Sequence, residues 1–297
     1  MKQFTKESLI AELQAIYARG WIEGMRVGGN DGLVGNTLET LLGITENNLP
    51  IPNAAEWELK AQRRGSTSLV TLFHMEPSPI ALKLVPSLLL PMYGWPHKSM
   101  ANEMSFRQTI NAVSVSDRGF QVVVNRQEQR IEVSFDATKV GSRHSAWLAK
   151  VEREIGLGQL NPQPYWGFND LEHKIGTKLT NAFFVLADSK KIVSQEYFHY
   201  NGILMLKTFS FEKFLEVMEQ GLIYVDFDAR TGHNHGTKLR LRTQILPLLY
   251  AEVTSIIDAP ISKADLAKVN LRAIATPAVM REEDLATIEQ EEEQEAP

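Results

Sequence analysis

The sequence predicts a mixed α/β fold in which a sheet is flanked by helices. Segments with apolar residues at helical spacing are interspersed with short runs of β-branched and aromatic residues, which are typical of strands. Of the 297 residues, 43% are hydrophobic and 23% are charged, the composition of an ordinary globular chain with one or two lobes. There is no cysteine, which excludes a disulfide framework and a thiolate metal site.

Two patterns argue against a membrane-bound or secreted protein. The apolar stretch 81–93 is interrupted by Lys83, Pro86 and Pro91 and is too short to span a bilayer. The N-terminus leads into an amphipathic segment rather than the apolar core of a signal peptide. We therefore expect no membrane partner and a cytoplasmic location.

The first predicted element is an amphipathic helix over residues 4–22, with Thr5 and Ser8 as candidate N-terminal caps. A glycine-rich stretch, 20–35, follows it. Glycines allow backbone N–H groups to approach a phosphate, but the same composition also suits a flexible connector. The stretch has no Gly-Lys-Ser/Thr ending, so we expect no nucleotide cofactor.

A possible catalytic motif lies at residues 52–60, which read PNAAEWELK. On a strand, Glu58 and Lys60 point to the same face because successive side chains alternate. A divalent metal explains this pairing, since carboxylates hold Mg²⁺ while an ammonium orients a water near phosphate. The spacing corresponds to the PD…(D/E)xK nuclease signature, with Asn53 in the place of the first Asp; Asn53 and Glu58 are then the candidate metal ligands. The alternative is a solvated strand face, because an isolated E-x-K sequence is common.

Residues around this motif support the same interpretation. A predicted helix over 35–43 carries Glu39 and ends at Gly43, and a strand predicted over 66–74 ends at His74. His74 either faces the metal site or is structural. Arg63 and Arg64 form a basic cluster with Lys60, which suits phosphate contacts beside the bond that is cut. The competing interpretation is a simple strand edge.

The sequence patterns in the middle of the chain predict a series of strands and helices with a structural role. The proline-rich stretch 79–98 is expected to be a loop over the active lobe. The remaining predictions are an antiparallel meander of strands over 106–115, 119–124 and 129–135, a helix over 145–155, a strand pair within 197–208, a helix over 211–220, a strand over 222–227, and short helices over 251–257 and 262–269.

A second cluster of charged residues begins where the strand over 222–227 ends. Arginine reads guanine through O6 and N7, so a basic ribbon here suits a DNA major groove. Two alternatives are a zinc site built on the His-x-His pair, for which no third strong ligand has suitable spacing, and a solvated hairpin. The candidate DNA-binding residues of this cluster are Asp228, Arg230, His233, His235, Lys238, Arg240 and Arg242.

Together these motifs resemble a known family. GNTLETLLGI, then P-N-x4-E-L-K, SLVTLFH and the distant H-x-H-G-T-x-x-R at 233–240 are similar, in this order, to the MvaI/BcnI family of restriction endonucleases, which are relatives of the MutH repair nickase. The resemblance covers roughly residues 20–250. It implies a PD-(D/E)xK restriction-endonuclease-like core, a second DNA-recognition lobe, and hydrolysis of duplex DNA with Mg²⁺.

The resemblance also implies roles and boundaries. Glu58 and Lys60 match the second carboxylate and the lysine, Asn53 takes the place of the first carboxylate, and Glu39 matches a supporting helix residue. The expected segments are a catalytic lobe (1–140), a recognition lobe (141–255), a C-terminal helical segment (256–281) and an acidic tail (282–297). A monomer, a cognate DNA methyltransferase and a short G·C-rich target of the CC-N-GG kind are further implications.

Asn53 leaves several functions open. An amide oxygen can ligate Mg²⁺ but brings no charge, so metal binding and cleavage should weaken. Either Asn53 is an engineered replacement of Asp, which the intact Glu58 and Lys60 favour, or it is natural and activity is weak or absent. The chain is therefore a type II restriction enzyme, a non-cleaving DNA-binding protein on a nuclease fold, or a MutH-like nickase controlled by a partner.

Without its acidic tail, the chain has a small positive net charge. The formal net charge is −5, but residues 282–297 contain eight acidic and no basic side chains. The rest of the chain has 31 basic and 28 acidic side chains, a net charge of +3, which is compatible with a DNA groove. The low-complexity tail is expected to be disordered and to compete with DNA for basic residues. If deleting the tail leaves the salt dependence of DNA affinity unchanged, the tail does not compete with DNA.

Overall fold

The computed structural model describes residues 4–25, 32–44 and 56–257, which form two compact units. Of these described residues, the first unit takes those within 4–68, 173–213 and 242–257, and the second takes 69–172 and 214–241. Asn53, the predicted helix over 262–269 and the acidic tail lie outside the described residues. Within them, no helix is long and apolar enough to cross a membrane.

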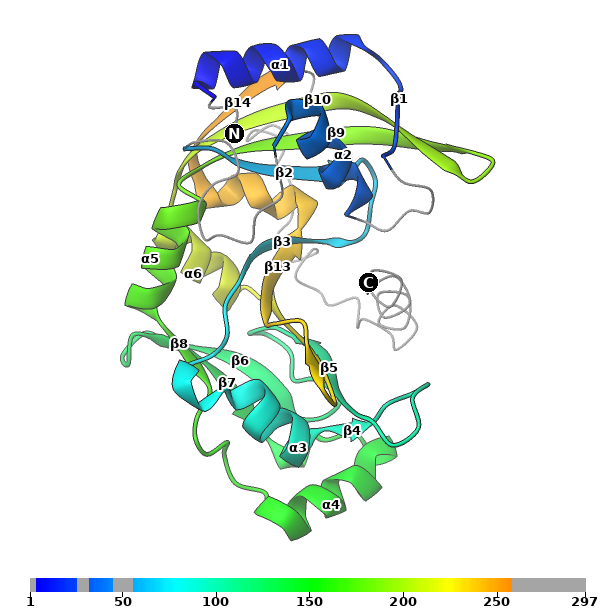
Figure 1. Ribbon diagram of the computed structural model, residues 1–297. Coiled ribbons are helices and arrows are strands. Elements are labelled where there is room, and N and C mark those ends of the chain that lie inside the picture. The colour runs from blue at the N-terminus through cyan, green and yellow to red at the C-terminus, as the bar shows by residue number, and fades with distance from the viewer. Residues whose placement is uncertain (1–3, 26–31, 45–55, 258–297) are drawn as a thin grey trace. The chain divides into compact units, whose positions relative to one another are not determined.

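The first unit is built on a five-stranded sheet in the order β1-β10-β9-β2, with β14 also pairing with β10 (Figure 1). Strand β2 runs parallel to β9, and the other pairs are antiparallel. The bounds are β1 Ile22–Glu23, β2 Glu58–Arg63, β9 Asn181–Ile192, β10 Gln195–Phe209 and β14 Tyr250–Ile257.

Helices α1 (Lys6–Ala18) and α2 (Leu33–Leu42) contribute to the apolar core of this unit. Thr5 caps α1 through a reciprocal pair of hydrogen bonds with Ser8, as the sequence predicts. Gly43 ends α2 at φ 69°, a left-handed conformation that suits glycine. The core joins buried residues of both helices to one face of the sheet, where the contributing strand residues are Leu59, Phe183, Val185, Ala187, Phe198, Tyr200 and Ile203.

The second unit contains two sheets. A six-stranded sheet has the order β3-β13-β11-β5-β4, with β12 pairing with β11, and a three-stranded sheet has the order β6-β7-β8. The bounds are β3 Leu69–His74, β4 Trp95–Pro96, β5 Met104–Ile110, β6 Phe120–Asn125, β7 Arg130–Phe135, β8 Tyr165–Gly167, β11 Ile223–Arg230, β12 His233–Asn234 and β13 Lys238–Arg242.

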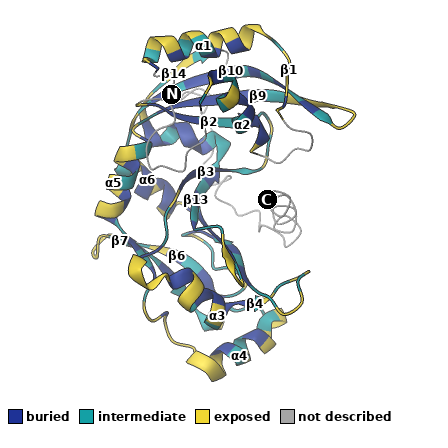
Figure 2. Ribbon diagram, in the orientation of Figure 1, coloured by how far each residue is buried: buried dark blue, intermediate teal, exposed yellow. Residues whose placement is uncertain are grey.

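Short helices complete the chain. They are α3 Leu90–Tyr93, α4 Ser145–Ile155, α5 Phe168–Lys178, α6 Phe211–Glu219, the 3-10 turns Ile80–Leu82, Ala137–Lys139, Ser142–His144 and Thr243–Leu249, and the π turn Val85–Leu89. The strands are largely buried, whereas the outward sides of the helices are exposed (Figure 2). The predicted helices over 145–155 and 211–220 are confirmed, and the predicted strand over 222–227 corresponds to the first part of β11.

Several predicted elements differ from the structure. Residues 250–257 form strand β14 along β10 rather than a helix. Residues 195–209 are one strand, whose hairpin partner is β9, rather than a strand pair. Of the meander, the antiparallel pairing of β6 with β7 is confirmed, but β5 belongs to another sheet, where it pairs with β11 and β4. The stretch 79–98 contains helical turns and β4 rather than a plain loop.

The two units do not follow the expected boundaries at residues 140 and 255. Strand β2 comes early in the chain, but its neighbour β9 begins at Asn181, so the first unit needs both segments. In the second unit, β5 similarly pairs with β11, which begins at Ile223. Each unit is therefore discontinuous in sequence.

Candidate active site and DNA-binding face

Strand β2 separates a polar face from an apolar one. Leu59 points into the core with the helices, so Glu58 and Lys60 lie on the opposite face, as the spacing predicts. Glu58 is aligned with Ala182 and Lys60 with Phe184 of the parallel neighbour β9. Although it is a carboxylate, Glu58 is only 2% exposed. A charge buried this deeply requires partners.

Two lysines surround this buried carboxylate. The Lys60 ammonium lies 3.0 Å from Glu58 Oε1, and the Lys178 ammonium, at the end of α5, lies 3.7 Å from the same oxygen. The sequence analysis did not identify Lys178. It is close because α5 ends directly before β9, and Ala182 of β9 is the residue aligned with Glu58.

The second carboxylate oxygen of Glu58 suits a cation. Oε2 is buried and has no hydrogen-bond partner among the described residues. Buried Tyr250 also has a hydroxyl without a hydrogen-bond partner there; burial raises the pKa of its phenol, and the Glu58 charge raises it further. An unsatisfied buried carboxylate oxygen is the donor type that Mg²⁺ prefers, so Glu58 fits this ion as one ligand, and the part of the chain that the structure describes holds no group of three or more His, Cys, Asp or Glu that would complete the site.

Arg63 and Arg64 both form ion pairs within the first unit. Arg63 lies on the Leu59 face of β2, and its Nε and Nη2 donate to the two carboxylate oxygens of Glu196 at 2.7 and 2.9 Å. Both side chains are nearly buried. Arg64 Nε lies 3.1 Å from Asp188 Oδ1, and its Nη2 donates to Asn201. Arg63 thus has a structural role, and the phosphate contacts predicted for both arginines stay predictions.

The other two predicted catalytic residues that the structure describes, Glu39 and His74, belong to different units. Glu39 is half-buried on α2, which contacts β2, and its supporting role stays a prediction. His74 ends β3 in the second unit and is exposed; a Cβ on Gly236 would lie 3.6 Å from His74 Cδ2, so His74 lies beside the H-x-H-G-T segment. The structure therefore brings Glu58 and Lys60 together and places His74 in the other unit.

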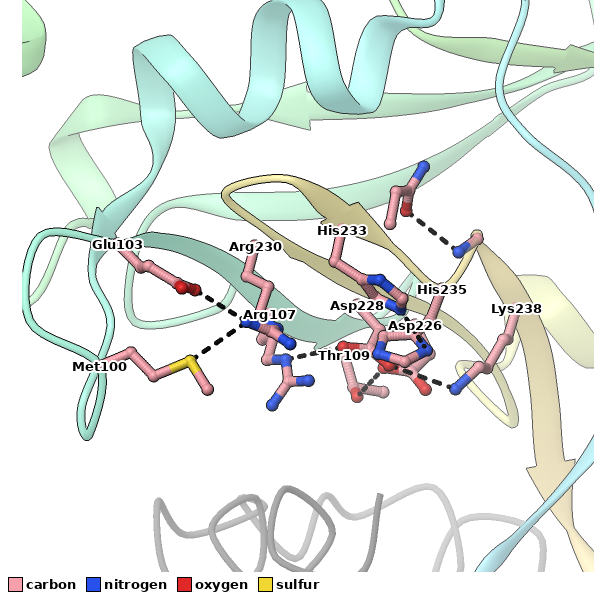
Figure 3. Close-up of polar contacts among 12 residues, drawn as sticks. Met100, Glu103, Arg107, Thr109, Asp226, Asp228, Arg230, His233, His235 and Lys238 are labelled. Atoms are coloured by element: carbon pink, nitrogen blue, oxygen red, sulfur yellow. Dashed lines mark hydrogen bonds and ion pairs between the residues drawn. The ribbon is translucent and has the colours of Figure 1, made fainter. Parts of the chain in front are cut away.

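A second concentration of charge covers one face of the six-stranded sheet. On β11, Val225, Phe227 and Ala229 are buried apolar residues, so Asp226, Asp228 and Arg230 share the opposite face. The neighbouring strands add charged or polar residues in register: Arg107 and Thr109 of β5 are aligned with Asp228 and Asp226, and Lys238 of β13 is aligned with Asp226. Figure 3 shows these side chains pointing toward one another.

Asp228 is the centre of this polar face. Its Oδ1 lies 2.7 Å from Arg107 Nε and its Oδ2 lies 3.5 Å from Lys238 Nζ. Asp228 is 3% exposed, yet neither of its oxygens, nor Arg107 Nε and Nη1, has a partner in hydrogen-bond geometry among the described residues. The 2.7 Å contact is therefore an ion pair whose angles do not suit a hydrogen bond. These Arg107 donors and Asp228 acceptors are therefore available to hydrogen-bond a polar ligand such as a base edge.

Two further ion pairs flank Asp228. Arg240 Nη1 donates to Asp226 Oδ2 at 2.8 Å, and the Thr109 hydroxyl donates to Asp226 Oδ1 at 3.1 Å. Arg230 Nη1 donates to Glu103 at 2.9 Å and contacts the sulfur of Met100 at 3.1 Å. Because each guanidinium is held by an acidic partner, its orientation is fixed before any ligand arrives.

The two histidines lie in and just after β12, which pairs with the end of β11. His233 Nε2 and His235 Nδ1 are 3.3 Å apart, and the His235 N–H donates to the Asp228 carbonyl. Burial lowers the pKa of His235, Asp228 opposes this shift, and the positive charges of His233, Lys238 and Arg107 add to it. The described residues contain no group of three or more His, Cys, Asp or Glu suited to a metal, so the zinc alternative has no support there.

Glu76 holds the turn that follows His235. Its Oε1 accepts the Thr237 N–H at 2.9 Å, its Oε2 accepts the Thr237 hydroxyl, and Asn234 also donates to it. Gly236 has φ 85°, which suits glycine at this turn. The sequence analysis missed Glu76, Arg107 and Lys178, because their importance comes from spatial neighbours that are distant in sequence.

Comparisons with known proteins identify the family and the fold of the chain. A family model for the MvaI/BcnI restriction endonuclease family matches residues 10–250. The fold is similar to a solved complex of the restriction endonuclease MvaI with its cognate DNA substrate, with a TM-score of 0.69, 22% sequence identity, and coverage of 86% of this chain and 100% of that chain. MvaI without DNA gives a TM-score of 0.48 at 21% identity, with the same coverage of both chains. A search of curated proteins finds no match.

Proposed function

Because the chain belongs to the MvaI/BcnI restriction endonuclease family, we propose that it cleaves duplex DNA at a specific sequence with Mg²⁺, as a type II restriction enzyme. The family and the mixed α/β fold are as expected from the sequence motifs, and both support this proposal. The observation that carries the proposed chemistry is the buried Glu58 carboxylate, with one oxygen near Lys60 and the other without a partner among the described residues.

The residues of β2 divide the chemical tasks between them. Glu58 Oε2, together with Asn53, would hold the metal ion. Bound there, Mg²⁺ supplies charge stabilisation for an in-line displacement by water at phosphorus. Lys60 places an ammonium next to Glu58 and donates hydrogen bonds to a phosphate oxygen or to the attacking water. The core behind Leu59 fixes the strand, so both groups keep their relative positions.

Sequence recognition is assigned to the polar face around Asp228. Arg107, Arg230 and Lys238 offer donors, and Asp228 offers acceptors, which are the groups that distinguish base edges in a major groove. The ion pairs orient these groups in advance, which lowers the entropic cost of binding. A solved structure of MvaI with its DNA substrate supports DNA as the ligand here.

Asn53 favours a second candidate function. Replacing a charged ligand by an amide removes several kcal/mol of attraction for a cation at an effective dielectric constant of about 20. A chain with Asn53 would then bind DNA without cutting it, either because Asn53 was engineered or because it is a natural feature. A MutH-like nickase that requires a partner is the third candidate.

The remaining features of the proposal follow from a restriction–modification role. The chain acts as a monomer in the cytoplasm, and a DNA methyltransferase protects the host's copies of the target. A target of the CC-N-GG kind is part of this proposal.

The test is cleavage of unmethylated phage DNA with Mg²⁺ by this chain and by its Asn53→Asp variant. Discrete bands from the variant and none from the original establish a restriction enzyme with a disabling residue, and the mapped ends give its target. If neither protein cuts while both retard DNA in a gel, the binding-only function is correct. If neither cuts nor binds, the proposal is wrong.

A further inference from the structure

Lys178 is a lysine with a fixed position beside the proposed cleavage site. It is the last residue of α5, its side chain is 23% exposed, and its ammonium lies 3.7 Å from Glu58 Oε1. Thr180, two residues later, anchors the chain: its carbonyl accepts the Phe209 N–H and its hydroxyl donates to the Gly176 carbonyl. The end of α5 is therefore tied to the sheet that carries Glu58.

Glu58 does not account for a second lysine. One carboxylate is neutralised by one ammonium, and Lys60 is already 3.0 Å from Oε1. Two ammonium groups beside the single oxygen Oε1 make this position suited to an external anion such as a phosphate, while Glu58 Oε2 remains for the metal ion.

We propose that Lys178 is a second phosphate-binding cation of the active site, which contacts the DNA backbone next to Glu58 and Lys60. This inference rests on the proposed function, because that function makes a phosphodiester the anion delivered to this position. Lys178 thereby helps to place the bond that is cut, in addition to orienting Glu58. Phosphate contacts of this type set the register of DNA without reading its sequence.

The test is DNA affinity without divalent metal, which does not depend on cleavage. A short fluorescent duplex with a central CC-N-GG is titrated in EDTA over a range of salt concentrations. The proteins are the original chain, Lys178→Met, Lys178→Arg and the matched control Lys174→Met, which removes the same charge one helical turn earlier. Thermal melting of each variant verifies folding.

We expect Lys178→Met to weaken binding about tenfold and to reduce the slope of log affinity against log salt by about one. Lys178→Arg should retain most of the affinity, and Lys174→Met should change the affinity and slope much less. If Lys178→Met and Lys174→Met lose DNA affinity equally, the lysines attract DNA only through their overall positive charge and Lys178 makes no specific phosphate contact. This result would overturn the inference.

An unchanged affinity and slope for Lys178→Met would also overturn it and leave Lys178 as a partner of Glu58 only. In both cases the original chain still binds the duplex, so the proposed function stands. If the original chain does not bind this duplex or unmethylated phage DNA, the proposed function itself fails and the inference fails with it.

Discussion

Neighbouring residues on β2 have opposite roles because they point to opposite faces of one strand. Glu58 and Lys60 face away from the helices, and Arg63 lies on the core side, where Glu196 holds it in a two-pronged ion pair. Arg63 also lies 5.5 Å from the centre of the Phe198 ring. A basic cluster in sequence is therefore divided between a polar face and a structural contact.

This division predicts different effects for two adjacent arginines. Arg63→Met leaves the Glu196 carboxylate buried without its main partner, so the free energy of unfolding should fall by about 3 kcal/mol. Arg64→Met, whose partner Asp188 is exposed, should cost less than about 1 kcal/mol. Urea unfolding measures both values. Equal losses from the two variants would contradict the assigned roles.

At the scale of elements, the H-x-H-G-T turn is held in place by Glu76. This carboxylate receives the Thr237 N–H at 2.9 Å, and the Thr237 carbonyl in turn accepts the Met75 N–H. The turn leads directly to Lys238 of β13, which contacts Asp228. Glu76 thus positions the recognition residues without needing to touch DNA.

Glu76→Ala should weaken duplex binding about tenfold, because the turn and Lys238 lose their fixed position. Glu76→Gln should have a smaller effect, since its amide oxygen can still accept the Thr237 N–H. Fluorescence anisotropy in EDTA compares the two variants. A loss of the same size from both would point to the negative charge of Glu76 rather than its role in the turn.

The sequence predicts those features of the elements that depend on local motifs. Motifs that are local were predictable: the Thr5 cap, the end of α2 at Gly43, and the shared face of Glu58 and Lys60. The sequence predicts a helix over 251–257, because no local pattern indicates that these residues pair with β10 as a strand. Arg107 and Lys178 were missed for the same reason: their partners lie 121 residues later at Asp228 and 120 residues earlier at Glu58.

On the scale of the whole molecule, each unit is assembled from separated segments. Strand β2 pairs with β9, and buried core residues such as Phe183, Phe198 and Tyr200 come from 120 or more residues later than β2. The unit that carries Glu58 therefore forms only after much of the chain has been made. Such non-local pairing slows folding.

This arrangement predicts that a fragment of residues 1–140 does not fold. It lacks β9, β10 and β11, so β2 and β5 lose their main partners and the first core is incomplete. We expect no cooperative transition in urea and poor dispersion of backbone amide signals. A cooperative transition would instead support a continuous catalytic lobe ending near residue 140.

The most direct test concerns Glu58 as the centre of cleavage. Single-turnover cleavage of the mapped target is measured for the Asn53→Asp protein, with and without Glu58→Gln, and DNA affinity is measured in parallel. The structure predicts that Glu58→Gln lowers the cleavage rate by about a thousandfold or more while duplex binding in EDTA persists. Cleavage at a comparable rate by the Glu58→Gln protein would show that DNA is cut elsewhere and would contradict the assignment.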